Sequence, residues 1–401
     1  MPSPQSPEFL LVAACCVWPP TPERTVRIRS AAVQALDWPL LLRIVDRQRV
    51  AALVHHGLHD AQIDVPETTA RSLAAQASRI GLQNLSLAAE SVRLQRLLDE
   101  AGITVMFLKG VSLSVLAYGS LALKHGKDID LLVPEKDALT ALDLLECAGY
   151  RILMPAPDLS QAQRRVVLKY DKEIILEHRQ SGLQVELHWH LVNNPDLLRG
   201  IDAAAPTQRV ALSADASLRT LERADLFAYL CAHGAGHGWS RLKWLADLAA
   251  LMCNMRGEDI ERLYAFAEQR GAGRCAAQAL LLCQELLHFQ LSPQFARRLA
   301  GDRRVRILKN VALSLISGDA DALQIWERPF ATTRLSLGNY LLGSGWRYWS
   351  TELRHHLLLL PDALRLPIPE RFPWLYDLFG IVRVPMWVWR KVRYRGRFGA
   401  H

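Results

Sequence analysis

The chain has 401 residues, of which half are apolar and 22% are charged, and its formal net charge is +8. A chain of this length usually folds into about two or three domains, and this apolar content can bury a core. The composition excludes collagen-like, disordered and small disulfide-framework proteins. No apolar run reaches the roughly 18–20 residues of a membrane-spanning helix. The longest, from Phe9 to Trp18, follows Glu8 rather than a basic segment, so we expect no secretory signal.

The seven cysteines are scattered and include no CxxC pair, which indicates a reducing cytoplasm. Cys275 and Cys283 are eight residues apart, a spacing that predicts one buried helix face.

The positive charge is concentrated at the C-terminus, because no acidic residue follows Asp377. We interpret this tail as a solvated terminus rather than a binding surface. Nucleic acid is disfavoured as a partner, since aromatic and basic residues are not interleaved elsewhere in the chain. The basic residues of the tail are Arg383, Arg390, Lys391, Arg393, Arg395 and Arg397.

The N-terminal third is predicted to be helical after a flexible arm. Residues 1–29 are rich in proline and predict the arm, and residues 30–101 show helical periodicity. Asp37 is placed to cap a helix that has Pro39 in its first turn. A long helical pattern from Pro66 ends at Gly102.

Residues 102–192 predict a compact unit of strands and helices, and residues 193–401 a second helical region that ends in the basic tail. We expect no strong strand after Pro195. The fold class is therefore α+β, with a small mixed sheet between two helical regions. The predicted strands are Ile103–Leu108, Asp128–Val133 and a hairpin of Glu173–His178 with Leu183–His190, and the predicted helices are Val111–Tyr118 and Lys136–Gly149.

Two carboxylates on the second predicted strand could bind a metal. Asp128 and Asp130 are one residue apart, so both point to the same face of the strand. Like charges held side by side need a counter-ion, and Mg²⁺ prefers oxygen ligands. The alternative is a pair of solvated aspartates at the start of a strand.

Three further features support a site near these aspartates. Lys109-Gly110 lies between a buried strand and a helix, where backbone amides and a lysine can bind phosphate. Glu186 shares a strand face with His188 and His190, and it is suited to be a third metal ligand or a general base. We expect His190 to be exposed. Lys124, His125 and Lys127 precede Asp128 and could pair with carboxylates or with phosphate.

Together these motifs resemble the uncharacterised nucleotidyltransferase family, which belongs to the superfamily with the DNA polymerase β-like fold. The central motifs are Phe107-Leu108-Lys109-Gly110, Asp128-Ile129-Asp130-Leu131-Leu132-Val133 and Val185-Glu186-Leu187-His188-Trp189. Further similarities lie at Leu36-Asp37-Trp38, Ala232–Trp239, Leu242–Asp247 and Arg371–Tyr376.

The resemblance implies Mg²⁺-dependent (or Mn²⁺-dependent) transfer of a nucleoside monophosphate from a nucleoside triphosphate to a hydroxyl of a small molecule, peptide or protein. Asp128, Asp130 and Glu186 would be the catalytic metal ligands. The other implied residues, which would bind the nucleotide, are Lys109, Gly110, Lys124, His188, His233, His237 and Lys243.

Two motifs depart from the usual pattern. The superfamily usually has Gly-Ser where this chain has Lys109-Gly110, and Gly119-Ser120 is a second candidate nearer Asp128. We prefer Lys109-Gly110, because a buried strand precedes it. Lys124 replaces a more usual arginine and loses the bidentate fork.

His233 and His237 are four residues apart, but Gly234, Gly236 and Gly238 interrupt the helical pattern, so we do not expect a metal site there. The resemblance places this segment against the catalytic unit and implies nucleotide or acceptor contact instead. An intrahelical pair of Lys243 with Asp247 is also expected. The rival to catalysis is a nucleotide-binding or antitoxin-like regulatory protein without turnover. A third possibility is an enzyme that modifies nucleic-acid ends.

Overall fold

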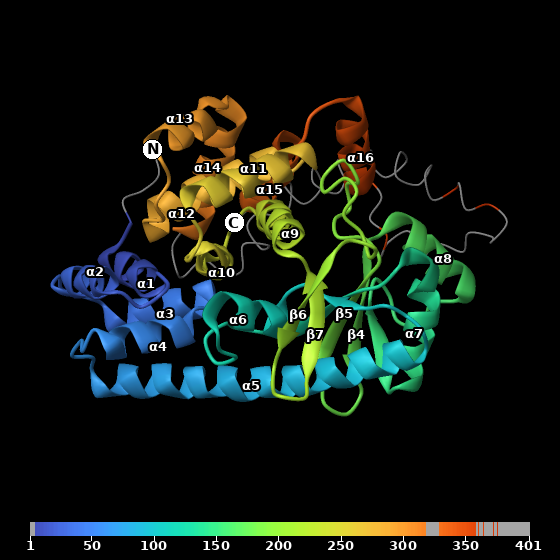
Figure 1. Cartoon of the computed structure of the whole chain (residues 1–401), viewed down its shortest axis with the longest axis horizontal. Coiled ribbons are helices and arrows are strands. Elements are labelled where there is room, and N and C mark those ends of the chain that lie inside the picture. Colours follow the sequence, from blue (N-terminus) through green and yellow to red (C-terminus); the bar gives the residue numbers. More distant parts are fainter. Residues whose placement is uncertain are drawn as a thin grey trace, which may run out of the picture.

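The computed structural model describes residues 5–317 and 329–357, together with the single positions 360, 364, 372 and 375. The basic tail after Asp377 and most of Arg371–Tyr376 lie outside the described residues. The fold is α+β, as predicted: a small mixed sheet has helices on both sides of it in sequence and in space (Figure 1). Among the described residues, no helix combines the length and apolarity that crossing a membrane would require.

A five-stranded sheet in the order β1-β2-β5-β4-β3 forms the centre of the fold. β2 and β5 run parallel, and the other neighbouring strands are antiparallel. The predicted hairpin is confirmed as β4 with β5, and the first predicted strand is shorter than expected. The strands are β1(Met106–Phe107), β2(Asp128–Leu132), β3(Tyr150–Met154), β4(Glu173–His178) and β5(Gln184–His188).

The expectation of no strong strand after Pro195 is wrong. β6(Thr207–Ala211) and β7(Ser217–Leu221) form a separate antiparallel hairpin. In β6 only Val210 is fully buried, so its sequence has no apolar run that would predict a strand. β3 was also not predicted. Its second residue, Arg151, is exposed and interrupts the apolar run.

The predicted flexible arm over residues 1–29 is wrong for most of that segment. Residues in it form α1(Pro7–Cys15) and α2(Pro22–Ala32), and Leu11 and Val12 are fully buried. Each helix starts with a proline directly after a residue that caps it, Ser6 for α1 and Thr21 for α2. These prolines are therefore helix-start residues rather than breakers, because proline is compatible with the first turn.

Two more N-terminal helices, α3(Trp38–Gln48) and α4(Ala51–Asp60), complete the N-terminal bundle. The predicted cap is confirmed, because the Asp37 carboxylate accepts a hydrogen bond from the backbone N–H of Leu40.

The long helix α5(Glu67–Glu100) runs beneath both the N-terminal helices and the sheet (Figure 1). Its buried residues lie along one stripe. Leu73 and Ile80 pack in the core of the helical region, whereas Leu87, Leu94 and Leu98 pack in the core of the sheet. One helix thus fixes the position of the N-terminal bundle relative to the strands.

Short helices connect the strands, and the later helices form a layer on the side of the sheet away from α5 (Figure 1). Cys275 and Cys283 are buried on α12, as predicted, and all seven cysteines are free. The connecting helices are α6(Gly110–Tyr118), η1(Glu135–Asp137), α7(Ala138–Cys147) and α8(Gln161–Tyr170). The later helices are α9(Arg223–Gly236), α10(Leu242–Met252), α11(Gly257–Gln269), α12(Gly273–Leu287), α13(Pro293–Gly301), α14(Arg303–Ile316), α15(Pro329–Leu342) and α16(Trp346–Leu357).

The glycines of α9 do not interrupt it, contrary to expectation, since the helix continues to Gly236. Gly234 is required by packing: a Cβ at this position would overlap the indole ring of Trp239, which is only 1% exposed. Trp239 is therefore a core residue and does not stack on a ligand.

We predict that Gly234→Ala destabilises the protein by about 1–3 kcal/mol, because the methyl group forces a buried ring out of place. The matched control is Gly236→Ala, where a Cβ would meet nothing within 4 Å. The control should be neutral or up to about 1 kcal/mol more stable, since alanine favours helix over glycine. Urea unfolding measures both, and equal effects of the two substitutions would contradict this packing.

Candidate active site

The parallel pairing of β2 with β5 brings two carboxylates together. Asp130 is the register partner of Glu186, and both line a cavity of about 210 Å³ that Asp128 also lines. We call this the carboxylate cavity. The three acidic residues predicted from sequence therefore share one cavity. Asp130 is 2% exposed, whereas Asp128, at the start of β2, is half-buried.

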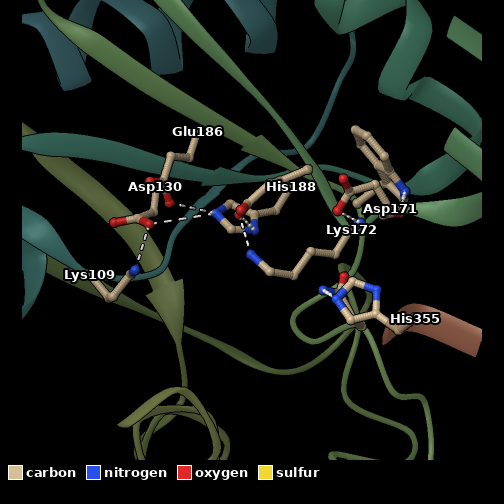
Figure 2. Close-up of polar contacts among 10 residues, drawn as sticks. Lys109, Asp130, Asp171, Lys172, Glu186, His188 and His355 are labelled. Atoms are coloured by element: carbon tan, nitrogen blue, oxygen red, sulfur yellow. Dashed lines mark hydrogen bonds and ion pairs between the residues drawn. The ribbon is translucent and has the colours of Figure 1, made fainter. Parts of the chain in front are cut away.

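Asp130 is held between two basic side chains (Figure 2). Its Oδ1 lies 2.8 Å from Lys109 Nζ and 3.5 Å from His188 Nε2. Burial would raise the pKa of Asp130, but the charges of Lys109 and His188 outweigh it and hold this pKa well below its usual range. Its Oδ2 is buried and has no hydrogen-bond partner among the described residues.

His188 joins three carboxylates at the end of β5. Its Nδ1 lies 3.0 Å from Glu173 Oε2, and its Nε2 lies 3.4 Å from Glu186 Oε2 as well as near Asp130. Burial opposes the charged imidazole, but Glu173 and Asp130 raise the pKa of His188 to about 10. His188 is thus a buried cation among acids, and its contact with the nucleotide stays a prediction.

The side-chain atoms of Asp130, Glu186 and His188 all lie within 4.8 Å of one another, a spacing that could hold a metal ion. Because His188 is protonated, its ring has no free lone pair, and such an ion would bind the carboxylate oxygens. Two of these side chains are carboxylates, and one Asp130 oxygen has no partner, so the group suits a hard divalent cation. Burial and the negative charge of Asp130 raise the pKa of Glu186 above its usual value. A cation between the two carboxylates would remove that repulsion.

Lys109 and Gly110 lie where β1 leads into α6, as predicted. Gly110 has a φ of +64°, a conformation that favours glycine, and a Cβ there would lie 3.5 Å from the Asp128 carbonyl oxygen. The Lys109 side chain points to Asp130 rather than into open space (Figure 2). Asp130 raises the pKa of Lys109 well above its usual value despite burial, so Lys109 is a firmly charged counter-ion.

Five further cations line the carboxylate cavity: Lys172 and four that we call the cation group, which are Arg49, Lys124, Arg241 and Lys243. Burial and the neighbouring charges of Lys124 and Arg49 lower the pKa of Lys243 to about 7. Burial and Arg49 lower the pKa of Arg241 to about 10. Within the described part of the chain, Arg49, Arg241 and Lys243 form no ion pair with a carboxylate. Positive charges gathered in this way indicate an anion site.

The expected pair of Lys243 with Asp247 is wrong. Asp247 instead lies 3.7 Å from Lys124 Nζ and accepts a hydrogen bond from the Tyr118 hydroxyl at 2.9 Å. These contacts cross from α10 to α6 and to the loop before β2, and they leave the Lys243 charge uncompensated.

The two histidines of α9 also line the carboxylate cavity. The rings of His233 and His237 are 4.6 Å apart, and His237 stacks on Trp244 at 5.2 Å. Burial and Lys109 lower the pKa of His237 to about 4 and hold the pKa of His233 well below its usual range. Both rings are therefore neutral at physiological pH. His190, in contrast, has a 49% exposed side chain, as expected.

Four charged residues of the site were not predicted: Arg49, Lys172, Glu173 and Arg241. Glu173 could have been found from the predicted hairpin, because its register partner in β4–β5 is His188. Arg49 had no such signal, since it is the left-handed residue that ends α3, far from the motifs in sequence. Arg241 immediately precedes the Leu242–Asp247 segment but has no distinctive spacing.

Comparison with known protein families matches residues 34–288 to the family described as uncharacterised nucleotidyltransferase. The matched span includes every residue described above that lines the carboxylate cavity. Comparison with curated proteins finds no match.

We predict that Lys109→Met lowers stability by about 3 kcal/mol without divalent metal, because it leaves a buried carboxylate unpaired. Mg²⁺ should then raise the melting temperature of this variant more than that of wild type, since the cation replaces the lost charge. Thermal unfolding with EDTA or Mg²⁺ measures this. Lys136→Met, at an exposed lysine, is the control. An unchanged melting temperature in EDTA would show that Lys109 is not a counter-ion.

Proposed function

The chain belongs to the uncharacterised nucleotidyltransferase family, and we propose that it transfers a nucleoside monophosphate to a hydroxyl with the help of Mg²⁺ or Mn²⁺. Family membership makes it a nucleotidyltransferase, for which a nucleoside triphosphate is a substrate. The metal, the residues that act and the acceptor are the proposed part.

One observation carries this proposal: a single cavity is lined by five carboxylates, among them Asp128, Asp130 and Glu186, and by three cations without a carboxylate partner among the described residues. A triphosphate with a divalent cation has the complementary charges, since the metal suits the carboxylates and the phosphate oxygens suit the cations. Asp128, Asp130 and Glu186 would hold the metal, and the unpartnered Oδ2 of Asp130 is placed for it. When bound, the metal supplies charge neutralisation and activation at the α-phosphate.

The cation group would bind the β- and γ-phosphates. Asp128 acts electrostatically on both Arg49 and Lys243, so the cation group lies at the Asp128 end of the carboxylates. Gly110 allows the backbone at the start of α6 to approach an anion closely, where helix amides favour negative charge. Lys109 keeps Asp130 charged, and His233 and His237 form a neutral wall of the cavity.

In the proposed reaction an acceptor hydroxyl oxygen attacks the α-phosphorus. The new O–P bond forms as the bond to the bridging oxygen breaks, and pyrophosphate leaves with that electron pair. The hydroxyl proton passes to water, and Glu186, as a metal ligand, would hold the cation beside the attacking oxygen. Positioning and charge stabilisation supply most of the acceleration, as in other phosphoryl transfers.

A nucleotide-binding regulator without turnover is the second candidate. The observation that favours it is that Lys109 and His188 already neutralise Asp130 without a metal. The acceptor hydroxyl of the enzyme could belong to a small molecule, a peptide or a protein, whereas the regulator has no acceptor. Turnover distinguishes the two candidates, because only the enzyme releases pyrophosphate.

We predict that Asp130→Asn lowers Mg²⁺-dependent pyrophosphate release by about 100-fold or more, because a charged ligand at the reacting phosphate is lost. The variant should keep its circular dichroism spectrum and a cooperative melt. Asp215→Asn, in the exposed loop between β6 and β7, is the control and should keep full activity. A folded Asp130→Asn protein with wild-type turnover would refute the mechanism.

We also predict that the protein takes up a proton when it binds ATP at pH 8. The pKa of Lys243 is about 7 in the free protein, so at pH 8 this side chain is mostly neutral. Triphosphate charges raise that pKa, and up to about one proton is bound per nucleotide. ATP affinity should accordingly fall as the pH rises above 7.

Calorimetry of ATP binding in buffers of different ionisation enthalpy measures this proton. Lys243→Gln should abolish the uptake, whereas Lys127→Gln, an exposed lysine that does not line the cavity, should leave it unchanged. The same uptake in Lys243→Gln and wild type would remove Lys243 from the anion site.

A further inference from the structure

A second cavity of about 400 Å³ lies next to the carboxylate cavity, and Lys172 lines both. Its walls are the end of α8, the residues that lead into β4, the segment after β5, and α16. Figure 2 shows the side chains in order, from Lys109 and Asp130 through His188 to Lys172 and His355. The Nε2 of His355, on α16, lies 3.0 Å from the Asn193 amide nitrogen, a contact that connects α16 to the segment after β5.

The strand register places this cavity at the opposite end of the site from the cation group. Lys124 precedes β2, and Asp130 is paired with Glu186 in the middle of that strand. Leu132, two residues further along β2, is level with His188, whose partner across β5–β4 is Glu173. Two residues of strand span about 7 Å. Lys172, which forms an ion pair with Glu173, begins the second cavity.

This arrangement matches what in-line displacement requires. The attacking and leaving oxygens lie on opposite sides of the phosphorus. If pyrophosphate leaves toward the cation group, the hydroxyl must approach from the far side of the carboxylates, where His188 contacts both Glu186 and Glu173. Resting on the proposed function, we propose that the second cavity is the acceptor site, and that the acceptor is a small molecule with a hydroxyl and an anionic group.

The size and charge of the cavity define this class of acceptor. About 400 Å³ lies in the range of small-molecule sites. Its two carboxylates already accept backbone hydrogen bonds: Asp171 from the N–H of Lys172, and Asp202 from the N–H of Ala204, each at 2.8 Å. The cations of the second cavity, which outnumber these two carboxylates, are Lys169, Lys172, Arg199 and Arg354.

Two of these cations are available to an anionic group. Lys169 and Arg199 form no ion pair with a carboxylate of the described residues. Lys169 Nζ lies 4.8 Å from the centre of the Tyr170 ring, so the ammonium sits beside an apolar surface rather than an acid. A carboxylate or phosphate on the acceptor would be attracted to this end of the cavity, with its hydroxyl directed past Lys172 toward Glu186.

The chemistry is the transfer described above, with this acceptor as nucleophile. Its hydroxyl oxygen forms a bond to the α-phosphorus, pyrophosphate leaves with the electrons of the broken bond, and the hydroxyl proton goes to water. The product is a phosphodiester between the nucleoside and the anionic compound. No oxidant or other co-reactant is needed.

The test uses matched pairs of hydroxyl compounds with the full-length protein, ATP and Mg²⁺: glycerol with glycerol 3-phosphate, glucose with glucose 6-phosphate, and 2-propanol with lactate. Pyrophosphate release and calorimetric binding, the latter with a non-hydrolysable ATP analogue present, are measured for each. We expect the anionic member of at least one pair to bind and to react with a kcat/KM at least ten times that of its neutral partner.

Lys169→Gln and Arg199→Gln should then raise the KM for that acceptor about fivefold or more, while the dissociation constant for ATP stays unchanged. Arg256→Gln, an exposed arginine outside both cavities, is the control. An unchanged acceptor KM in both variants overturns the acceptor site. Equal or better use of neutral compounds, or no binding of any anionic compound to the nucleotide-bound protein, overturns the anionic class.

Failure of this inference is distinguishable from failure of the proposed function. If wild type does not bind Mg²⁺-ATP, the proposed function is wrong and the acceptor assays lose their basis. Wild type could instead bind Mg²⁺-ATP and release pyrophosphate only with compounds whose KM is the same in Lys169→Gln, Arg199→Gln and wild type. In that case the function holds and the second cavity is not the acceptor site.

Discussion

The repulsion between Asp130 and Glu186 is the constraint on which the rest of this site depends. Parallel pairing of β2 with β5 fixes the two carboxylates side by side, and the burial of Asp130 with the half-burial of Glu186 excludes much of the water that would screen them. The fold responds with two cations of its own, Lys109 from the start of α6 and His188 from the end of β5. These cations leave one Asp130 oxygen without a partner. The cluster is therefore neutralised in the free protein by these two cations, and the oxygen of Asp130 without a partner is where the proposed divalent cation would bind.

The cation group depends on helices from distant parts of the chain. Arg49 ends α3 in the N-terminal bundle, and Arg241 and Lys243 begin α10 in the C-terminal layer, so the sheet alone could not build the anion site. The long helix α5 makes this assembly possible, because its buried stripe belongs to both hydrophobic cores and fixes the bundle against the strands. The cost of gathering like charges appears in the lowered pKa values of Lys243 and Arg241. An anion that relieves this repulsion gains affinity without further rearrangement of the protein.

The sequence predicted the structure well where residues suited to catalysis lie within a local strand or turn pattern. The aspartates of β2, Glu186 and the β4–β5 hairpin follow from alternation and turn residues, and they carried the family resemblance that the match over residues 34–288 confirms. Tertiary contacts were not predictable in the same way. Lys109 was predicted to contact phosphate because it precedes a helix, but only the three-dimensional structure shows that its amine reaches Asp130. The prolines of residues 1–29 were interpreted as an arm, because proline starts a helix only where a capping residue precedes it, as Ser6 and Thr21 do here. The strand β6 was missed because a half-exposed strand has no apolar run.

The two cavities differ in their relation to the family. All residues named in the carboxylate cavity lie within the matched residues 34–288, whereas Thr351, Arg354 and His355 of the second cavity come from α16, beyond that span. A catalytic centre must keep the geometry of its metal and phosphate contacts, but an acceptor site has to change when the acceptor changes. A cavity wall that comes from outside the matched residues, such as α16, can change with the acceptor without disturbing the metal and phosphate contacts. Lys172 is the point of contact between the two parts, because its ion pair with Glu173 leads through His188 to the carboxylates. Binding of an anionic acceptor beside Lys172 would therefore act on the same charge network that positions Asp130 and Glu186.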